Sequence, residues 1–233
     1  MKVFITGDTH GQHSRFNKIK KFCKEHNTTK NDIMIILGDV GFNYYINSWD
    51  DSLKRFAQEL PITFFCIRGN HEQRPEKISR YVEKTFLNNS VLYQEEYPDL
   101  IFSKDGNVYT LNDKKYLVLG GAYSVDKYYR LATYNQWFES EQLSLQEQNE
   151  IYKNLENLTF DAVLSHTCPY SYIPTECFIS RINQLTVDNG MEKFLDAVLN
   201  EFSFNKDWYC GHWHINKKVD NIQFLFEDIL EIL

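Results

Sequence analysis

Several features are missing from this sequence of 233 residues, and each absence excludes a class of protein. The chain has no excess of basic residues: its formal net charge is −7, so stable binding to nucleic acid is not expected. No apolar run approaches the length of a membrane span. Met1 leads into a short run ended by Gly7, which does not resemble a signal peptide. We therefore expect a soluble cytoplasmic protein.

The sequence also lacks a disulfide framework. Its five cysteines are odd in number, and no two have C-x-x-C spacing, which indicates reduced thiols in a reducing compartment. A chain of this length can bury a stable core without cross-links. No repeat, low-complexity stretch or linker is evident, so we predict one domain over residues 1–233.

In the first third of the chain, short continuous apolar runs alternate with segments whose apolar residues have helical spacing. Residues 2–6, 32–37 and 62–67 are short β-branched and aromatic runs, which are typical of buried strands. Residues 14–25 and 49–60 lie between them and have helical spacing. This β-α-β-α-β order predicts an α/β fold, in which helices cover a sheet with parallel strands.

Local signals refine these elements. Ser14 is the expected N-cap of the first helix, and Trp49 and Leu53 are expected on the buried face of the second. Residues 121–136 show no regular pattern and predict a long loop of the kind that often forms a lid. The rest of the second half predicts a hairpin with its turn at Asn112-Asp113-Lys114, helices and further strands, at residues 107–120, 144–158, 161–165, 191–202, 207–210 and 217–226.

Polar side chains of a few types follow nearly every predicted strand. Because the carboxyl ends of strands in open α/β sheets meet along one edge, these side chains are expected to converge. His212 and His214 alternate along what we expect to be extended chain, so they should point the same way. The converging groups are two carboxylates, an amide and several imidazoles: Asp8, His10, Asp39, Asn70, His166, His212 and His214.

This donor set predicts a metal centre. Carboxylate oxygen and imidazole nitrogen suit Mn, Fe, Zn, Co or Ni and do not select among them. Seven groups fit two ions, because each ion then has four protein ligands if Asp39 bridges. Two such ions can clamp the oxygens of an in-line phosphoryl displacement and lower the pKa of a shared water. Glycines precede the proposed ligands and permit the strand ends to approach a metal closely: Gly7, Gly38, Gly69 and Gly211.

Each of these residues also has an ordinary explanation. A lone Asp at a strand end is usually a turn former or a helix N-cap, and His166 alone would more often be a hydrogen-bonded buried histidine. These explanations must be invoked separately for every block, which favours the metal site. Arg130, in the long loop, is a candidate to bind a phosphate oxygen, with a solvated surface loop as an equal alternative.

Taken together, the blocks resemble the calcineurin-like metallophosphoesterase superfamily. The resemblance covers essentially the whole chain and implies two packed mixed β-sheets flanked by helices, with the site at the sheets' edge. The blocks that carry it, in order, are Asp8-Thr9-His10, Gly38-Asp39, Gly69-Asn70-His71-Glu72, His166 and Gly211-His212-Trp213-His214.

The resemblance also implies a role for each residue. His71 and Asn70 would lie beside the phosphate, and His71 would donate a proton to the leaving group, which is worth about 10²–10⁴ in rate. Asp39 would be the bridging, catalytically essential carboxylate. The first metal would be held by Asp8, His10, Asp39 and His214, and the second by Asp39, Asn70, His166 and His212.

One position departs from the superfamily's pattern. Phe42 stands where a second Asp often follows Gly38-Asp39, and in relatives that Asp orients the catalytic His. Glu72 or Asn43 could substitute, or the ester could have a leaving group that needs little protonation. The missing Asp, and the missing Arg after it, argue against the protein Ser/Thr phosphatase branch.

The function favoured by these residues is hydrolysis of a small phosphate mono- or diester, such as a nucleotide. A protein phosphatase and a nuclease are alternatives, and net acidity counts against the nuclease. A scaffold that keeps the fold without catalysis is a further alternative. It is disfavoured because the ligand set and His71 are complete.

Overall fold

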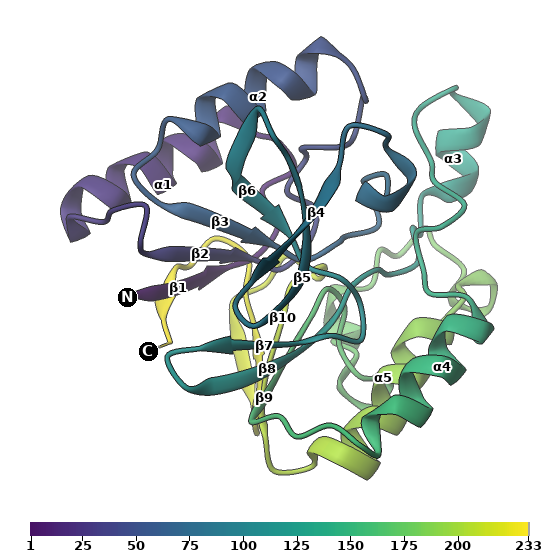
Figure 1. Cartoon of the computed structure of the whole chain (residues 1–233). Coiled ribbons are helices and arrows are strands. Elements are labelled where there is room, and N and C mark those ends of the chain that lie inside the picture. The colour runs from purple at the N-terminus through teal and green to yellow at the C-terminus, as the bar shows by residue number, and fades with distance from the viewer. Residues whose placement is uncertain (233) are drawn as a thin grey trace.

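Two mixed β-sheets pack face to face in the computed structural model, which describes residues 1–232 (Figure 1). The first sheet has the strand order β13-β1-β2-β3-β6-β5-β4, and the second has the order β11-β12-β10-β9-β8-β7. The central strands of each sheet run parallel, and the outer strands pair antiparallel. The predicted α/β sandwich is therefore confirmed.

The strands of the first sheet are β1 (Val3–Thr6), β2 (Ile33–Ile36), β3 (Thr63–Cys66), β4 (Val82–Phe86), β5 (Asn89–Gln94), β6 (Tyr97–Phe102) and β13 (Leu230–Glu231). Those of the second are β7 (Val108–Leu111), β8 (Lys114–Leu119), β9 (Ala162–Ser165), β10 (Asp207–Cys210), β11 (Lys217–Val219) and β12 (Ile222–Phe224).

Helices form the two outer layers. Figure 1 shows α1 (His13–His26) and α2 (Ser48–Gln58) over the outer face of the first sheet, and α4 (Leu145–Leu155) and α5 (Gly190–Val198) over the second. The short α3 (Lys127–Ala132) stands at one side of the molecule. Within residues 1–232 no helix is both long and apolar enough to cross a membrane.

Successive side chains along a strand point to opposite faces of the sheet, so they pack in different apolar layers. In β1, Phe4 packs in the core under α1 and α2, whereas Val3 and Ile5 pack between the sheets. In β3, Phe64 and Phe65 divide in the same way. Strands that are buried on both faces therefore appear as continuous apolar runs, which is why they could be identified from the sequence.

Two local predictions were wrong. The N-cap position of α1 is Gln12, without a side-chain hydrogen bond, and Ser14 lies inside the helix. Trp49 is 74% exposed rather than buried, although Leu53 is buried as predicted. Trp49 lies in the first turn of α2, which begins at Ser48 and is capped by Asn47, and of the two only Leu53, one turn later, joins the core.

Other elements were missed. The strands β4, β5 and β6 were not predicted, and the loop predicted over residues 121–136 contains α3. The turn between β4 and β5 consists of Leu87 and Asn88, both with positive φ, a conformation that Leu rarely adopts. The predicted hairpin is confirmed, with Asn112 and Asp113 as its two-residue turn.

Candidate metal centre

Two buried carboxylates form the base of the site, one at the end of β1 and the other at the end of β2. Asp8 Oδ1 accepts a hydrogen bond from the His212 backbone N–H at 2.9 Å, and Asp39 Oδ1 accepts one from the His71 backbone N–H at 2.8 Å. The second oxygen of each, Oδ2, is buried and has no hydrogen-bond partner among residues 1–232. Such a buried anionic oxygen is costly unless a cation completes its surroundings.

Imidazoles surround the first unpaired oxygen. The Nε2 atoms of His10 and His214 lie 3.6 and 3.4 Å from Asp8 Oδ2 and only 2.9 Å from each other. His10 also places Nδ1 3.8 Å from Asp39 Oδ2. Separations of this size are those of neighbouring ligands around one transition-metal ion, whose bonds to nitrogen and oxygen are about 2.0–2.2 Å long.

A second group of donors lies on the other side of Asp39. His166, at the end of β9, places Nε2 3.7 Å from Asp39 Oδ2 and 2.8 Å from Asn70 Oδ1. Its Nδ1 donates to the Leu37 carbonyl at 2.7 Å, so the lone pair of Nε2 faces Asn70 Oδ1, which is itself an acceptor. Asn70 Nδ2 donates to Ser124 Oγ. Backbone support of this kind is typical of metal-binding histidines.

Electrostatics within the cluster favour ionised carboxylates and a neutral His212, the forms that bind metal, whereas His214 is shifted the other way. Burial opposes ionisation of Asp8 and Asp39, but the surrounding imidazoles outweigh it and lower the pKa of both. Burial lowers the pKa of His212 to about 3, with nearby His166 adding to the shift, so its ring is neutral at pH 7. The contact with Asp8 raises the pKa of His214.

The backbone at the site is unusual. His10, Asp39, His212 and His214 all have positive φ, between 48° and 66°. His212 and His214 therefore do not alternate along extended chain, contrary to the prediction, although His214 does reach Asp8. Left-handed non-glycine residues cost conformational energy and cluster at functional sites, so this clustering is a further sign of function.

Two glycines show how tightly the strand ends approach each other. A Cβ at Gly69 would overlap the Asp39 carboxylate, and a Cβ at Gly38 would overlap the His166 ring. Gly38 also has a φ of +97°, which favours glycine. At both positions the lack of a side chain lets two strand ends approach closely, as expected from the sequence. At Gly69 this close approach alone accounts for the glycine.

Phe42, which stands where the superfamily's pattern often has a second Asp, is part of the apolar core. Its side chain is fully buried and packs against Phe16, Phe64 and Phe102 in the core beneath α1 and α2. It therefore points into the apolar layer and belongs to the packing of the first sheet.

Each of the two proposed substitutes for the missing Asp uses one side-chain oxygen in a hydrogen bond to a residue other than His71. Glu72 Oε1 accepts from the Gly69 backbone N–H at 3.0 Å, and burial raises the pKa of Glu72 to about 8, so that it is mostly protonated at neutral pH. Asn43 Oδ1 accepts from Tyr81 Oη at 2.8 Å. Burial lowers the pKa of His71, and the carboxylates that oppose this shift are instead Asp39 and Asp126.

A cavity of ≈ 480 Å³ opens on one side of the metal centre. We call it the aromatic cavity, because Tyr44, Tyr45 and Trp49 line it together with Asp39 and His71. None of the three aromatic residues was predicted to lie at the site. A run of aromatic residues follows the Gly38-Asp39 block in the sequence, and it could have indicated that aromatic side chains lie at the site.

A second cavity of ≈ 490 Å³ opens on the other side and is also lined by Asp39 and His71. We call it the apolar cavity, because Val125, Phe178, Ile179 and Trp213 contribute to its wall. The two cavities therefore share only Asp39 and His71.

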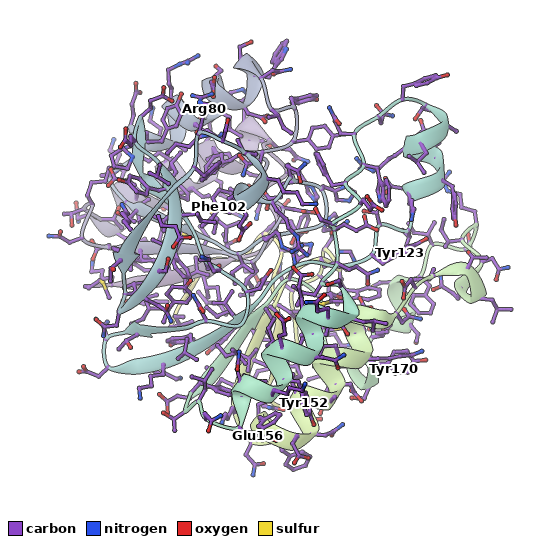
Figure 2. All side chains as sticks on the ribbon, turned by 45° about the vertical axis from the view of Figure 1, so that its right-hand side comes forward. Arg80, Phe102, Tyr123, Tyr152, Glu156 and Tyr170 are labelled. Carbon is purple, nitrogen blue, oxygen red and sulfur yellow. The ribbon has the colours of Figure 1, made fainter. Side chains whose placement is uncertain are left out.

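Arg130 lies on α3, at the wall of the aromatic cavity. Its guanidinium donates to Tyr44 Oη at 3.1 Å and to the Gln136 carbonyl at 3.1 Å, and it pairs with Asp126 at 2.8 Å. In Figure 2, α3 stands clear of both layers above the labelled Tyr123. The structure thus places Arg130 near the predicted site but on a segment that projects from the body of the molecule.

The sequence pattern described as calcineurin-like phosphoesterase matches residues 1–216. The chain belongs to this family. As a calcineurin-like phosphoesterase it is a metal-dependent hydrolase of phosphoric esters. The family implies divalent metal ions, and the Asp and His groups described above offer places for them.

Solved structures share the fold at low identity. One crystal structure superposes with a TM-score of 0.59 over 99% of this chain and 95% of the other, at 14% identity. That of TT1561 from Thermus thermophilus covers 91% of this chain and 81% of the other, with a TM-score of 0.48 and 11% identity. The first similarity shows the common architecture.

A local similarity to a curated protein is of a different kind. The UDP-N-acetylglucosamine--N-acetylmuramyl-(pentapeptide) pyrophosphoryl-undecaprenol N-acetylglucosamine transferase of Clostridium novyi (strain NT) is 28% identical over 92 residues. These are 39% of this chain and 26% of the transferase, so the chain spans about a quarter of that relative's length. The match supports no inference about activity.

Proposed function

We propose that this calcineurin-like phosphoesterase holds two divalent transition-metal ions and hydrolyses a phosphate mono- or diester of a small molecule or nucleotide. The observation that carries the proposal is the pair of buried oxygens, Asp8 Oδ2 and Asp39 Oδ2, which lack hydrogen bonds within residues 1–232 and face imidazole nitrogens. Two buried negative charges this close together call for cations.

The donors divide into two sets around Asp39. Two trios have ligand atoms that all lie within 4.8 Å of one another: Asp8, His10 and His214, and Asp8, Asp39 and His166. Asn70 Oδ1 adjoins His166, and the His212 ring lies 5.0 Å from that of His166. Asp8 belongs to both trios, and Asp39 Oδ2 lies 3.8 Å from His10 Nδ1 and 3.7 Å from His166 Nε2. Following the resemblance, we assign Asp8, His10, Asp39 and His214 to one ion, and Asp39, Asn70, His166 and His212 to the other. Mn, Fe, Zn and Ni all suit these donors.

Bound divalent ions would supply a hydroxide nucleophile near neutral pH and offset the charge of the phosphate. The protein's own part begins with His71, which lines both cavities beside Asp39. Burial lowers the pKa of His71 in the free protein. A negatively charged phosphate ester beside it would raise that pKa, so that the imidazole can carry the proton that it gives to the leaving oxygen.

The test is turnover by metal-stripped protein of p-nitrophenyl phosphate and bis(p-nitrophenyl) phosphate, with Mn, Fe, Zn or Ni added back singly. Activity that rises to a plateau at two bound ions per chain, measured by elemental analysis, is the expected result. A plateau at one ion would contradict the dinuclear centre. Two bound ions without turnover of either ester would contradict small-ester hydrolysis and favour a macromolecular substrate or a scaffold.

A further inference from the structure

The proposed phosphate position has an open cavity on each of two sides. The aromatic and apolar cavities have nearly equal volumes, ≈ 480 and ≈ 490 Å³, and both are bounded by Asp39 and His71. A phosphomonoester carries one organic group and would fill one cavity, whereas a phosphodiester carries two. Building on the proposed function, we infer that the substrate is a phosphodiester whose two organic groups lie in the two cavities, with a planar aromatic group against Tyr45 and Trp49.

Two aromatic side chains at the aromatic cavity lie outside the apolar core. Trp49 is 74% exposed and Tyr45 is 53% exposed, and Trp49 has no aromatic partner among residues 1–232. Large apolar side chains exposed beside a concave site are the informative exceptions on a protein surface. A planar group that stacks on them would remove that surface from water.

The backbone under these aromatics is braced. The Asp50 carboxylate accepts hydrogen bonds from the backbone N–H groups of Tyr45 and Ile46 at 3.2 and 2.7 Å, and Asn47 caps α2 through the backbone N–H of Trp49. The aromatic rings are therefore presented from fixed backbone positions. Pre-organisation of this kind reduces the entropic cost of binding and is expected of a recognition surface.

The apolar cavity offers a different surface. Phe178 and Ile179 are 37% and 48% exposed, and the Phe178 ring is tilted over Trp213 at a centroid distance of 6.2 Å. The rest of its wall includes charged and amide side chains, among them Arg181 and Asn189, so this cavity suits a group with both apolar and hydrogen-bonding parts. Because the two cavities differ in lining, the two ends of the diester are expected to differ in chemistry.

The α3 segment borders both cavities. Asp126, near its start, lines the apolar cavity, and Arg130, one turn later, lines the aromatic cavity. The two side chains form an ion pair of 2.8 Å, so the residue at the wall of one cavity is bound directly to the residue at the wall of the other. A diester with one group in each cavity would thus have this pair within the walls that surround it.

The experiment uses three esters with one leaving group: p-nitrophenyl phosphate, methyl p-nitrophenyl phosphate and bis(p-nitrophenyl) phosphate. The metal-loaded full chain is compared with Trp49→Ala, Trp49→Phe and Phe178→Ala. We expect kcat/KM to be highest for the bis ester, and both alanine variants to lower it by about 10- to 100-fold. For the methyl ester only one alanine variant should have this effect, because only one large group is present. Trp49→Phe should restore most of the loss.

Matched controls come from exposed residues outside both cavities. Tyr134 is 99% exposed and Leu185 is 95% exposed, so Tyr134→Ala and Leu185→Ala should leave all three kcat/KM values unchanged. Faster turnover of the monoester, with the bis ester insensitive to both cavity variants, would overturn the inference and leave the proposed function standing. No metal-dependent turnover of any ester would overturn both.

Discussion

The loops that carry the proposed metal ligands and the α3 segment beside them are held to the molecule in different ways. The loops after β1 and β2 are joined by backbone hydrogen bonds from His10 to Asp39 at 2.7 Å and from Gly11 to Val40 at 3.0 Å. The loop after β10 is joined to that after β9 by a bond from Gly211 to His166. By contrast, α3 contains no buried residue and is tied to the 41–47 loop through Arg130.

This difference matches two demands on such an enzyme. A metal centre needs its donors fixed to within fractions of an ångström, and bonds between several strand ends supply that rigidity. A segment that meets the substrate must admit and release it, and regions with few buried contacts open at low free-energy cost. Changes in the loops should therefore abolish the chemistry, whereas changes in α3 should alter substrate use.

The largest effect is expected for Asp39→Asn, which removes the proposed bridging charge. Turnover should fall by at least about 10³-fold, because bound metal ions contribute several kcal/mol of charge stabilisation in the transition state. The measurement is kcat with parallel metal analysis. Asp32→Asn is the matched control: Asp32 is equally a buried carboxylate, but it accepts hydrogen bonds from the backbone of Lys2 and Thr29, away from the site. Equal kcat in both variants would refute the bridging role.

His71→Ala should come next, with a loss of about 10²–10⁴ in rate and no loss of metal. The loss should be greater for alkyl esters, whose leaving oxygens need a proton, than for p-nitrophenyl esters. A plot of log kcat against leaving-group pKa would therefore become steeper. An unchanged slope would show that His71 is not the proton donor.

The loops that carry the proposed metal ligands were more predictable than the rest of the site, and the reason is physical. Asp8, Asp39 and His166 each follow a strand buried on both faces, so an apolar run in the sequence marks where each ligand begins. β4 offers no such signal, because its residues are at least partly exposed and its turn lacks the usual Gly or Asn-Gly. The cavity walls were predicted only in part: Arg130 was a candidate, but its contact with Tyr44 arises only through the tertiary fold and has no local signal in the sequence.

Substitutions at Phe42 test whether this one position contributes packing rather than catalysis. Phe42→Asp, which restores the residue common in relatives, should destabilise the protein by about 3–5 kcal/mol, since it removes a ring from the core and buries a carboxylate. Phe42→Leu, which keeps an apolar side chain, should cost about 1–2 kcal/mol. Denaturant unfolding of the metal-loaded proteins measures both. A Phe42→Asp protein of normal stability and higher kcat would instead place this side chain beside His71.

The smallest effect is expected in α3. Arg130→Ala removes the hydrogen bonds to Tyr44 and Gln136 and should lower kcat/KM for bis(p-nitrophenyl) phosphate about tenfold, or about 1.4 kcal/mol. The free energy of unfolding should change by less than about 1 kcal/mol, because the ion pair with Asp126 is partly exposed. Lys127→Ala is the matched control: it removes a cation from the same helix, whose ammonium lies over Trp137 rather than at a cavity wall. If both variants lose activity equally, the cause is loosening of α3 or loss of positive charge, and Arg130 has no specific part in holding the substrate.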